Sequence, residues 1–269
     1  MFFRKIFVFL QKDFLEAFSY KSAIFFTSLT MISHLVTFFF VAKLMGNLAD
    51  GYLKPYGAGY FPFVLIGIAF SGFALSVMGS ISGAVLKEQG TGTLEAILLT
   101  PTSLWTVIFA GSFSTIVLGL IQMGAYLAIG ALLLNVDLSR LNLFSFAFMI
   151  FLSIAGLSGL GLISAGFSLV FKRGDPVSYF FNAASRFLSG VYFPISILPG
   201  WVQKISYIFP TTYSLEGFRK AAFLGAPPVA LQNEMLALLL FAAIFLPVGI
   251  LYFQWALRQA KKDGSLAFV

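Results

Sequence analysis

The sequence predicts an all-α membrane protein with six transmembrane helices. Hydrophobic residues make up 59% of the 269 residues and charged residues only 10%, whereas a soluble domain averages about 25% charged residues. The mean hydropathy is +0.94. Six long stretches with almost no charge follow one another, separated by short polar segments. These spans and their loops use up the chain, so we expect a single transmembrane domain, residues 1–269.

Each apolar stretch exceeds the roughly 20 residues that a helix needs to cross about 30 Å of hydrocarbon. We expect spans at residues 23–42, 60–85, 104–134, 141–171, 177–198 and 235–257. Small residues let neighbouring helices approach closely. They predict helix contacts at Gly79 and Gly83 in the second span, and at Gly156, Gly159 and Gly161 in the fourth.

The first residues predict an amphipathic helix, residues 1–21, lying in the membrane interface. Phe7, Leu10, Phe14 and Phe18 recur at three- and four-residue steps, with charged residues on another side. A plain helical extension of the first span is the alternative. No small-residue cleavage site follows an apolar core, so we expect no cleaved signal peptide.

Basic residues indicate the orientation. Six spans put both termini on one side, and with those termini inside, ten of the 17 Lys and Arg residues fall in cytoplasmic segments. The same bias explains the net charge of +7 without a nucleic-acid partner. We therefore expect a multi-pass protein of a prokaryotic inner membrane with cytoplasmic termini.

Residues 194–233 are apolar but rich in Pro and Gly, and no unbroken run there is long enough to cross a bilayer. We expect two short helices, at residues 198–209 and 210–223, that re-enter the outer leaflet between spans five and six. Irregular backbone at membrane depth is tolerated only where protein or water covers it, so this re-entrant region should pack against the spans.

The polar segment at residues 87–101 follows the second span. We expect Gly90 and Gly92 to turn the chain, because each Gly lowers helix propensity by about 1 kcal/mol. A short capped helix at residues 94–99 then ends before Pro101. An ordinary solvated loop is the alternative.

Two motifs together resemble a known family. The first is the run from Glu88 to Glu95 with the Leu-Leu-Thr-Pro that ends at Pro101, and the second is the Gly-Val-Tyr-Phe-Pro that ends at Pro194. In this order and about a hundred residues apart, they are similar to the type-2 permeases of ATP-binding cassette exporters. The resemblance covers nearly the whole chain and says little about the substrate.

The resemblance implies a transmembrane half-transporter that moves an amphipathic drug, lipid or lipid-linked glycan outward. It implies an ATP-binding cassette ATPase subunit and a second permease copy, the same or similar, as partners in the membrane lipid. The residues implied to couple to the ATPase are Glu88, Gly90, Gly92, Thr93, Leu94, Glu95 and Pro101. The sequence has no G-x-x-x-x-G-K-[ST] phosphate loop, so ATP and magnesium are expected on the partner, with no cofactor and no catalytic residue here.

Arg186 lies about nine residues into the fifth predicted span, where a charge should face protein or water. One interpretation is that it binds an anionic group on a substrate pathway with Asn182, Tyr192 and Phe193. The alternative is a structural pairing with backbone carbonyls or with Glu216.

Two other functions are weighed. A secondary transporter or channel would use His34 and Arg186, the ionisable residues within the predicted spans. An intramembrane serine protease would use Ser158 in its Gly-Leu-Ser-Gly run, but the single histidine lies far upstream. The sequence contains no cysteine, so we expect no thiolate metal site, and no metal site of another kind is predicted.

Overall fold

The computed structural model describes residues 11, 15, 19–46, 50–90, 92, 99, 103–171 and 174–262. Every regular element in these ranges is helical, which confirms the all-α fold. In chain order they are α2 (Lys21–Met45), α3 (Asp50–Leu53), η2 (Lys54–Tyr56), α4 (Tyr60–Gly90), α6 (Leu104–Leu133), α7 (Leu143–Phe171), α8 (Pro176–Leu188), η3 (Ile195–Ile197), α9 (Gly200–Ser206), α10 (Pro210–Phe223), η4 (Pro228–Leu231) and α11 (Gln232–Lys262). The predicted interfacial helix, residues 1–21, lies almost wholly outside the described residues.

Five of the described helices, α2, α4, α6, α7 and α11, are long and apolar enough to cross a membrane. The predicted fifth span, residues 177–198, contains instead the 13-residue helix α8. At 1.5 Å per residue α8 rises about 20 Å, less than a bilayer core. It ends at Leu188, and Gly190 then turns the chain at a φ of +81°. The count of six full-length spans is therefore not confirmed.

Helix α8 runs antiparallel to α4 and packs against α4 and α7. Near its start, Asp175 accepts a hydrogen bond from Ser82 of α4. About two turns further along, Asn182 Nδ2 donates to the carbonyl of Ser71 at 3.0 Å. The chain after α8 then reaches α4 near Gly67, where an added Cβ would lie 2.2 Å from the Val191 carbonyl oxygen. The chain thus returns across the bundle even though α8 is short.

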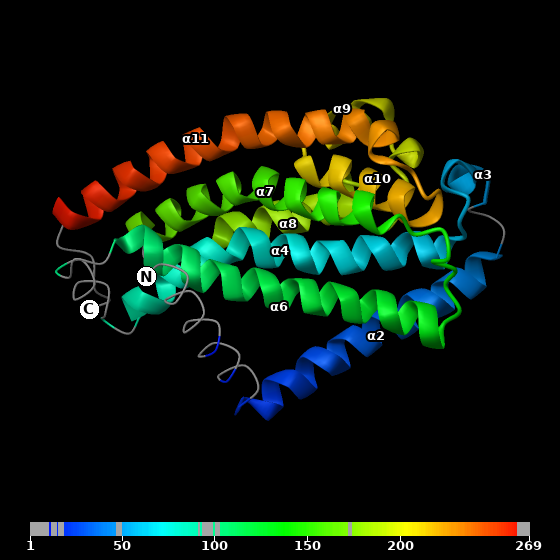
Figure 1. Cartoon of the computed structure of the whole chain (residues 1–269), viewed down its shortest axis with the longest axis horizontal. Helices are drawn as coiled ribbons and strands as arrows, with labels where there is room; N and C mark the ends of the chain where they lie inside the picture. Colours follow the sequence, from blue (N-terminus) through cyan, green and yellow to red (C-terminus); the bar gives the residue numbers. More distant parts are fainter. Residues whose placement is uncertain are drawn as a thin grey trace.

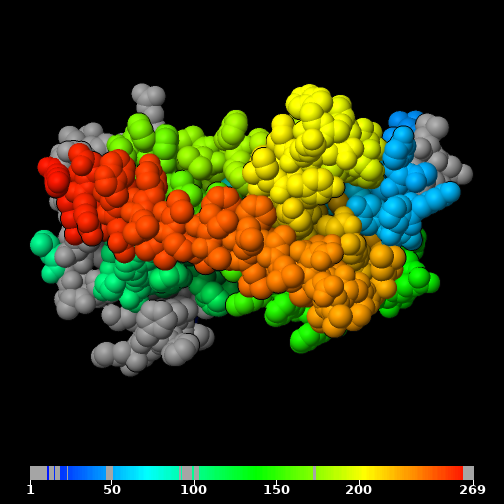
Figure 2. Space-filling view, turned by 90° about the horizontal axis from the view of Figure 1, so that it is seen from above, coloured from blue at the N-terminus to red at the C-terminus, as the bar shows by residue number. Residues whose placement is uncertain are grey.

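The long helices lie side by side around α4 (Figure 1). In the most apolar 18-residue window of α4, 78% of the residues are buried, against 6% in α2. Helix α11 follows α7 closely along its length and covers the face seen in Figure 2. Helix α2 crosses α6 obliquely and diverges from the bundle towards Lys21 (Figure 1). The core therefore surrounds α4 and α7, and α2 contributes little to it.

Small residues in α7 make the close helix contacts that the sequence predicts. A Cβ on Gly159 would lie 2.3 Å from the backbone of Phe245 in α11, and one on Gly161 would lie 2.7 Å from the carbonyl oxygen of Met78 in α4. Gly83 in α4 is different, because a Cβ there would meet nothing within 4 Å. Its predicted role as a helix contact is not what the structure shows.

The chain alternates between two ends of the bundle. The "Lys87 end" holds the last turns of α4, α7 and α11 and the start of α6, and the "α10 end" holds α3, α9 and α10 (Figure 1). Both short helices predicted after residue 198 are present, as α9 and α10. Helix α10 packs against α7, α11 and α4, as expected for a covered segment. Its position in the outer leaflet stays a prediction.

Candidate functional site

The segment predicted to couple to a partner begins later than expected. Helix α4 continues through Lys87 and Glu88 and ends at Gly90, so these residues extend a span rather than open a loop. The turn is confirmed at Gly92, whereas Gly90, the other glycine predicted to turn the chain, is still helical. Gly92 has a φ of +69°, a conformation that favours glycine, and its N–H donates to the Gln89 carbonyl at 3.2 Å.

Most of the remaining segment lies outside the described residues. Thr93, Leu94, Glu95 and Pro101 belong to this part, so the short helix and the coupling role predicted for them stay predictions. Leu99 is described, is helical and is 89% exposed.

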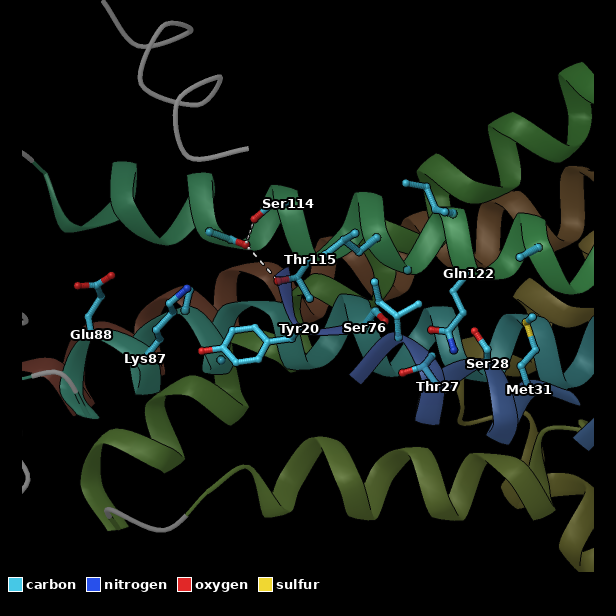
Figure 3. Close-up of a pocket in the computed structure, with 18 of the residues that line it drawn as sticks. Tyr20, Thr27, Ser28, Met31, Ser76, Lys87, Glu88, Ser114, Thr115 and Gln122 are labelled. Atoms are coloured by element: carbon cyan, nitrogen blue, oxygen red, sulfur yellow. Dashed lines mark hydrogen bonds between the residues drawn. The ribbon is translucent and has the colours of Figure 1, made fainter. Parts of the chain in front are cut away.

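A cavity of about 740 Å³ opens between α2, α4 and α6 and reaches the Lys87 end. Figure 3 shows Lys87 and Glu88 at one end of it and Gln122 at the other. The apolar part of its wall includes Ile24, Met31, Val107, Leu118 and Ile121. Lys87 and Glu88, two charged residues of the predicted coupling segment, therefore line an open cavity as well as forming the end of α4.

A smaller cavity of about 250 Å³ adjoins the first, because Ser76 and Gln122 line both. Its wall carries Arg186 of α8, His34 of α2 and Tyr126 of α6. His34 Nδ1 and the Tyr126 hydroxyl are 3.3 Å apart. The two cavities therefore meet at Ser76 and Gln122; the larger has Lys87 and Glu88 at its far end, and the smaller has Arg186 in its wall.

The residues predicted for a substrate pathway separate into two groups. Arg186 and Tyr192 line the smaller cavity, and Tyr192 stacks on Phe38 with ring centroids 5.3 Å apart. Asn182 is buried, and its amide is occupied by the Ser71 carbonyl. Phe193 lines neither cavity. A direct role for these residues in transport remains a prediction.

Arg219, within the helix predicted at residues 210–223, is a buried charged residue that the sequence did not single out. Only 2% of it is exposed. Its Nη2 donates to the carbonyls of Gly190 at 2.7 Å and Phe63 at 3.2 Å, and its guanidinium lies 3.4 Å from the centroid of the Phe63 ring. Burial lowers the pKa of Arg219 to about 10, so it stays protonated at neutral pH. A signal was present, because Leu215 and Ala222 flank it at i−4 and i+3 on one helix face.

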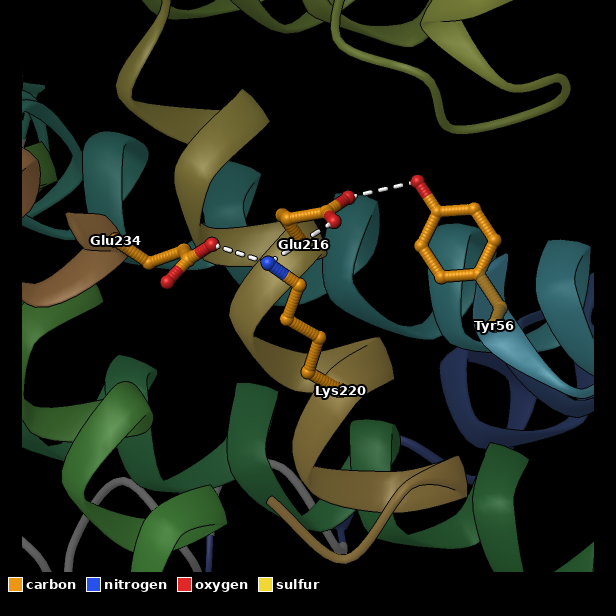
Figure 4. A network of polar contacts seen from close by, with 4 residues as sticks. All are labelled: Tyr56, Glu216, Lys220 and Glu234. Carbon is orange, nitrogen blue, oxygen red and sulfur yellow. Dashed lines mark hydrogen bonds and ion pairs between the residues drawn. The ribbon is translucent and has the colours of Figure 1, made fainter. Parts of the chain in front are cut away.

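A polar network fixes α10 to its neighbours (Figure 4). Glu216 accepts a hydrogen bond from Tyr56 at 2.7 Å and lies 3.4 Å from Lys220, which reaches Glu234 of α11 at 2.7 Å. Burial and the Glu216 charge raise the pKa of Tyr56. Burial opposes the charge on Lys220, but the hydrogen bond to Glu234 and both carboxylates outweigh it and raise the pKa of Lys220. Glu216 is thus paired here and not with Arg186.

Asp175 is a second residue that the sequence did not single out. Its carboxylate accepts hydrogen bonds from Ser82 of α4 and Ser164 of α7. It also caps α8 by accepting from the Ser178 N–H at 3.0 Å. The Asp-Pro pair that opens α8 was the available signal, since Asp is favoured at an N-cap and Pro at the next position.

The arrangement around Ser158 does not resemble a protease site. Its hydroxyl donates to the Ile154 carbonyl of its own helix at 2.6 Å, while His34 of α2 is 3.3 Å from the hydroxyl of Tyr126 in α6. Among the described residues, no group of three or more His, Asp and Glu side chains is placed to hold a metal ion.

Comparison with known proteins follows this geometry. The pattern of the family described as ABC-2 type transporter matches residues 4–223. A "Putative transport permease ycf38" of Cyanophora paradoxa is 27% identical over 65% of this chain and 58% of its own length. The "Inner membrane transport permease YadH" of Escherichia coli is 23% identical over 80% of this chain and 84% of its own. "Nodulation protein J" of Sinorhizobium fredii is 27% identical over 78% and 86%.

Proposed function

Because the chain belongs to the ABC-2 type transporter family and is a permease subunit of such a system, we propose that it exports an amphipathic molecule with energy from a separate ATPase. The permease provides the membrane passage, and ATP and magnesium are bound by the ATP-binding cassette partner. The membrane is a prokaryotic inner membrane, with both termini and the Lys87 end on the cytoplasmic side.

The continuity between the coupling segment and the cavity is the observation that carries this proposal. Helix α4 runs without a break from the cavity wall at Ser76, through Lys87 and Glu88, to Gly90, two residues before the turn at Gly92. A displacement of that turn by a docked ATPase is transmitted along a rigid helix to the cavity. Helix α2, which packs loosely against both α4 and α6, can then separate from them.

The docking part of the proposal is tested by co-purification with the ATPase subunit. Replacing residues 90–95 by a Gly/Ser linker, or introducing Glu95→Arg, is expected to abolish the complex, because the contact surface is lost or its charge reversed. The matched control is Asp137→Arg, which reverses an exposed carboxylate at the α10 end. An intact complex in both coupling variants would refute the assignment of this segment.

A second permease copy is proposed to pack along α8. Tyr179, Phe180 and Phe187 are 60–77% exposed and lie within about 100° of one another around the helix. They form one apolar face beside Ala183. Since the chain has no cysteine, Ala183→Cys tests this directly: oxidation in membranes is expected to yield a disulfide-linked dimer. Leu236→Cys, on the exposed face of α11, is the control, and equal cross-linking of both would contradict the interface.

A further inference from the structure

The charge of Arg186 has no acidic counterpart in the part of the chain that the structure describes. Its Nε donates to the Ser71 hydroxyl at 3.0 Å, and no carboxylate is within ion-pair distance. Glu216, the acid that the sequence offered as a partner, is engaged by Tyr56 and Lys220. A cation held within a membrane bundle is expensive unless it meets an anion or a dense set of carbonyls.

Elsewhere in this molecule, backbone carbonyls do bind a buried guanidinium. The lack of such carbonyl contacts at Arg186 among the described residues is therefore informative. Arg219 is sealed by the carbonyls of Gly190 and Phe63 and by the Phe63 ring. Arg186 is only partly buried and faces the smaller cavity. A structural arginine and a cavity arginine therefore differ here in both partners and accessibility.

The cavity in front of Arg186 has neutral polar groups in its wall. Thr30 and His34 of α2 and Gln122 and Tyr126 of α6 contribute them, beside apolar residues such as Phe38, Ile68 and Leu75. Hydroxyl, amide and imidazole N–H groups donate hydrogen bonds to an anion without adding a competing negative charge. A guanidinium binds phosphate or carboxylate through paired N–H groups, more strongly than it binds a neutral acceptor.

The larger cavity, next to this polar one, has a mainly apolar wall. It shares Ser76 and Gln122 with the smaller one (Figure 3), and its wall also includes Met31, Leu118 and Ile121. Gly83 leaves open space beside it, since a Cβ there meets nothing within 4 Å. A molecule that fills both cavities needs an anionic group at one end and a flexible apolar chain at the other.

We propose that the joined cavities bind one anionic amphiphile, with its phosphate or carboxylate head at Arg186 and its apolar chain between α2, α4 and α6. That the bound molecule is the transported cargo rests on the proposed transport function. Binding is measured on the permease without any ATPase, so failure of the binding site and failure of ATP coupling are separate results.

The test uses dodecyl phosphate as the probe and native mass spectrometry of the permease in phosphatidylcholine nanodiscs. Dodecyl phosphate is expected to bind with a stoichiometry of one per chain. Dodecyltrimethylammonium has the same chain with a cationic head, and inorganic phosphate has the head alone, so both are expected to bind at least about tenfold more weakly.

Two substitutions localise the two parts of the ligand. Arg186→Gln is expected to weaken dodecyl phosphate binding about tenfold or more, because a charge-assisted hydrogen bond is lost, and Arg186→Lys restores part of it. Gly83→Phe fills the open space and is expected to weaken the probe by a similar factor. Arg140→Gln removes an exposed arginine at the α10 end and should leave binding unchanged. Thermal unfolding of each variant confirms that it is folded.

The outcomes separate clearly. Equal binding to wild type and to folded Arg186→Gln, or equal binding of the anionic and cationic probes, would overturn the proposal. Phosphatidic acid added to the nanodisc distinguishes two sources of the same chemistry. Displacement of the probe assigns the site to anionic lipids of the bilayer, and retention assigns it to a cargo of another anionic class; both keep the anionic site at Arg186.

Discussion

Two arginines of this chain, Arg186 and Arg219, have contrasting surroundings. The contrast distinguishes a residue that stabilises the fold from one that faces a cavity. Arg219 sits at the α10 end among carbonyls of α4 and of the turn after α8. Arg186 lies on α8, donates a hydrogen bond to the Ser71 hydroxyl and lines the smaller cavity. The charge of Arg219 is bound by backbone carbonyls of the fold, whereas the charge of Arg186 is accessible to a ligand in the cavity.

The same division holds for the helices around them. At the α10 end, Tyr56, Glu216, Lys220 and Glu234 join three elements into one network (Figure 4). Along the α2 side, the helices enclose about 740 Å³ of cavity instead. This arrangement suits the proposed mechanism. The α10 end stays fixed, while α2 moves away from the bundle when the ATPase acts at the Lys87 end.

The largest expected effect is on the support side, in Arg219→Met. Removing the guanidinium leaves the carbonyls of Gly190 and Phe63 buried without their donor, so we expect a loss of about 3 kcal/mol or more in stability. Arg186→Gln should lose less than about 1 kcal/mol. Thermal unfolding of both in detergent checks this, and equal losses would break the contrast between the two residues.

The glycines of α7 and α4 give the next test. Gly159→Ala places a Cβ 2.3 Å from the Phe245 backbone, so α7 and α11 must move apart, at about 1–3 kcal/mol. Gly83→Ala enters open space and should be neutral or slightly stabilising, because Ala favours helix over Gly. The same unfolding assay measures both. A destabilised Gly83→Ala would show that the cavity is closed in solution.

The smallest expected effect concerns alkaline pH. The folded-state pKa of Lys220 is raised above its ordinary value of 10.5, so its contribution to stability is complete below about pH 10.5 and is lost as the pH rises through the folded value. Unfolding temperatures between pH 9 and pH 11.5 should therefore fall, and the fall should be shallower in Lys220→Met. An identical pH profile for both proteins would remove Lys220 from the network's energetics.

The sequence predicts the long apolar helices well, because a run of some 25 apolar residues has few alternatives in a membrane. It overestimates the fifth span because apolar composition continues past Gly190, where the backbone turns. It predicts the helix at residues 210–223 that carries Arg219, but not that carbonyls 28 and 156 residues away bind the guanidinium. Such partners are set by packing, which local spacing does not encode.

The candidate site was only partly predictable for the same reason. Arg186 was identifiable from its position within an apolar stretch, but the cavity before it depends on how α2 diverges from α4 and α6. The helical extension of α4 through Lys87 and Glu88 was hidden by the following glycines. The turn at Gly92 was predictable, because the residue itself tolerates a positive φ.

Transport in proteoliposomes tests the central claim, a passage in this chain driven by a separate ATPase, most directly. We expect labelled dodecyl phosphate to cross the bilayer only when permease, ATPase subunit and ATP with magnesium are all present, and to stop when ATP is replaced by a non-hydrolysable analogue. The same rate of crossing from the permease alone, with no nucleotide supplied, would contradict the account.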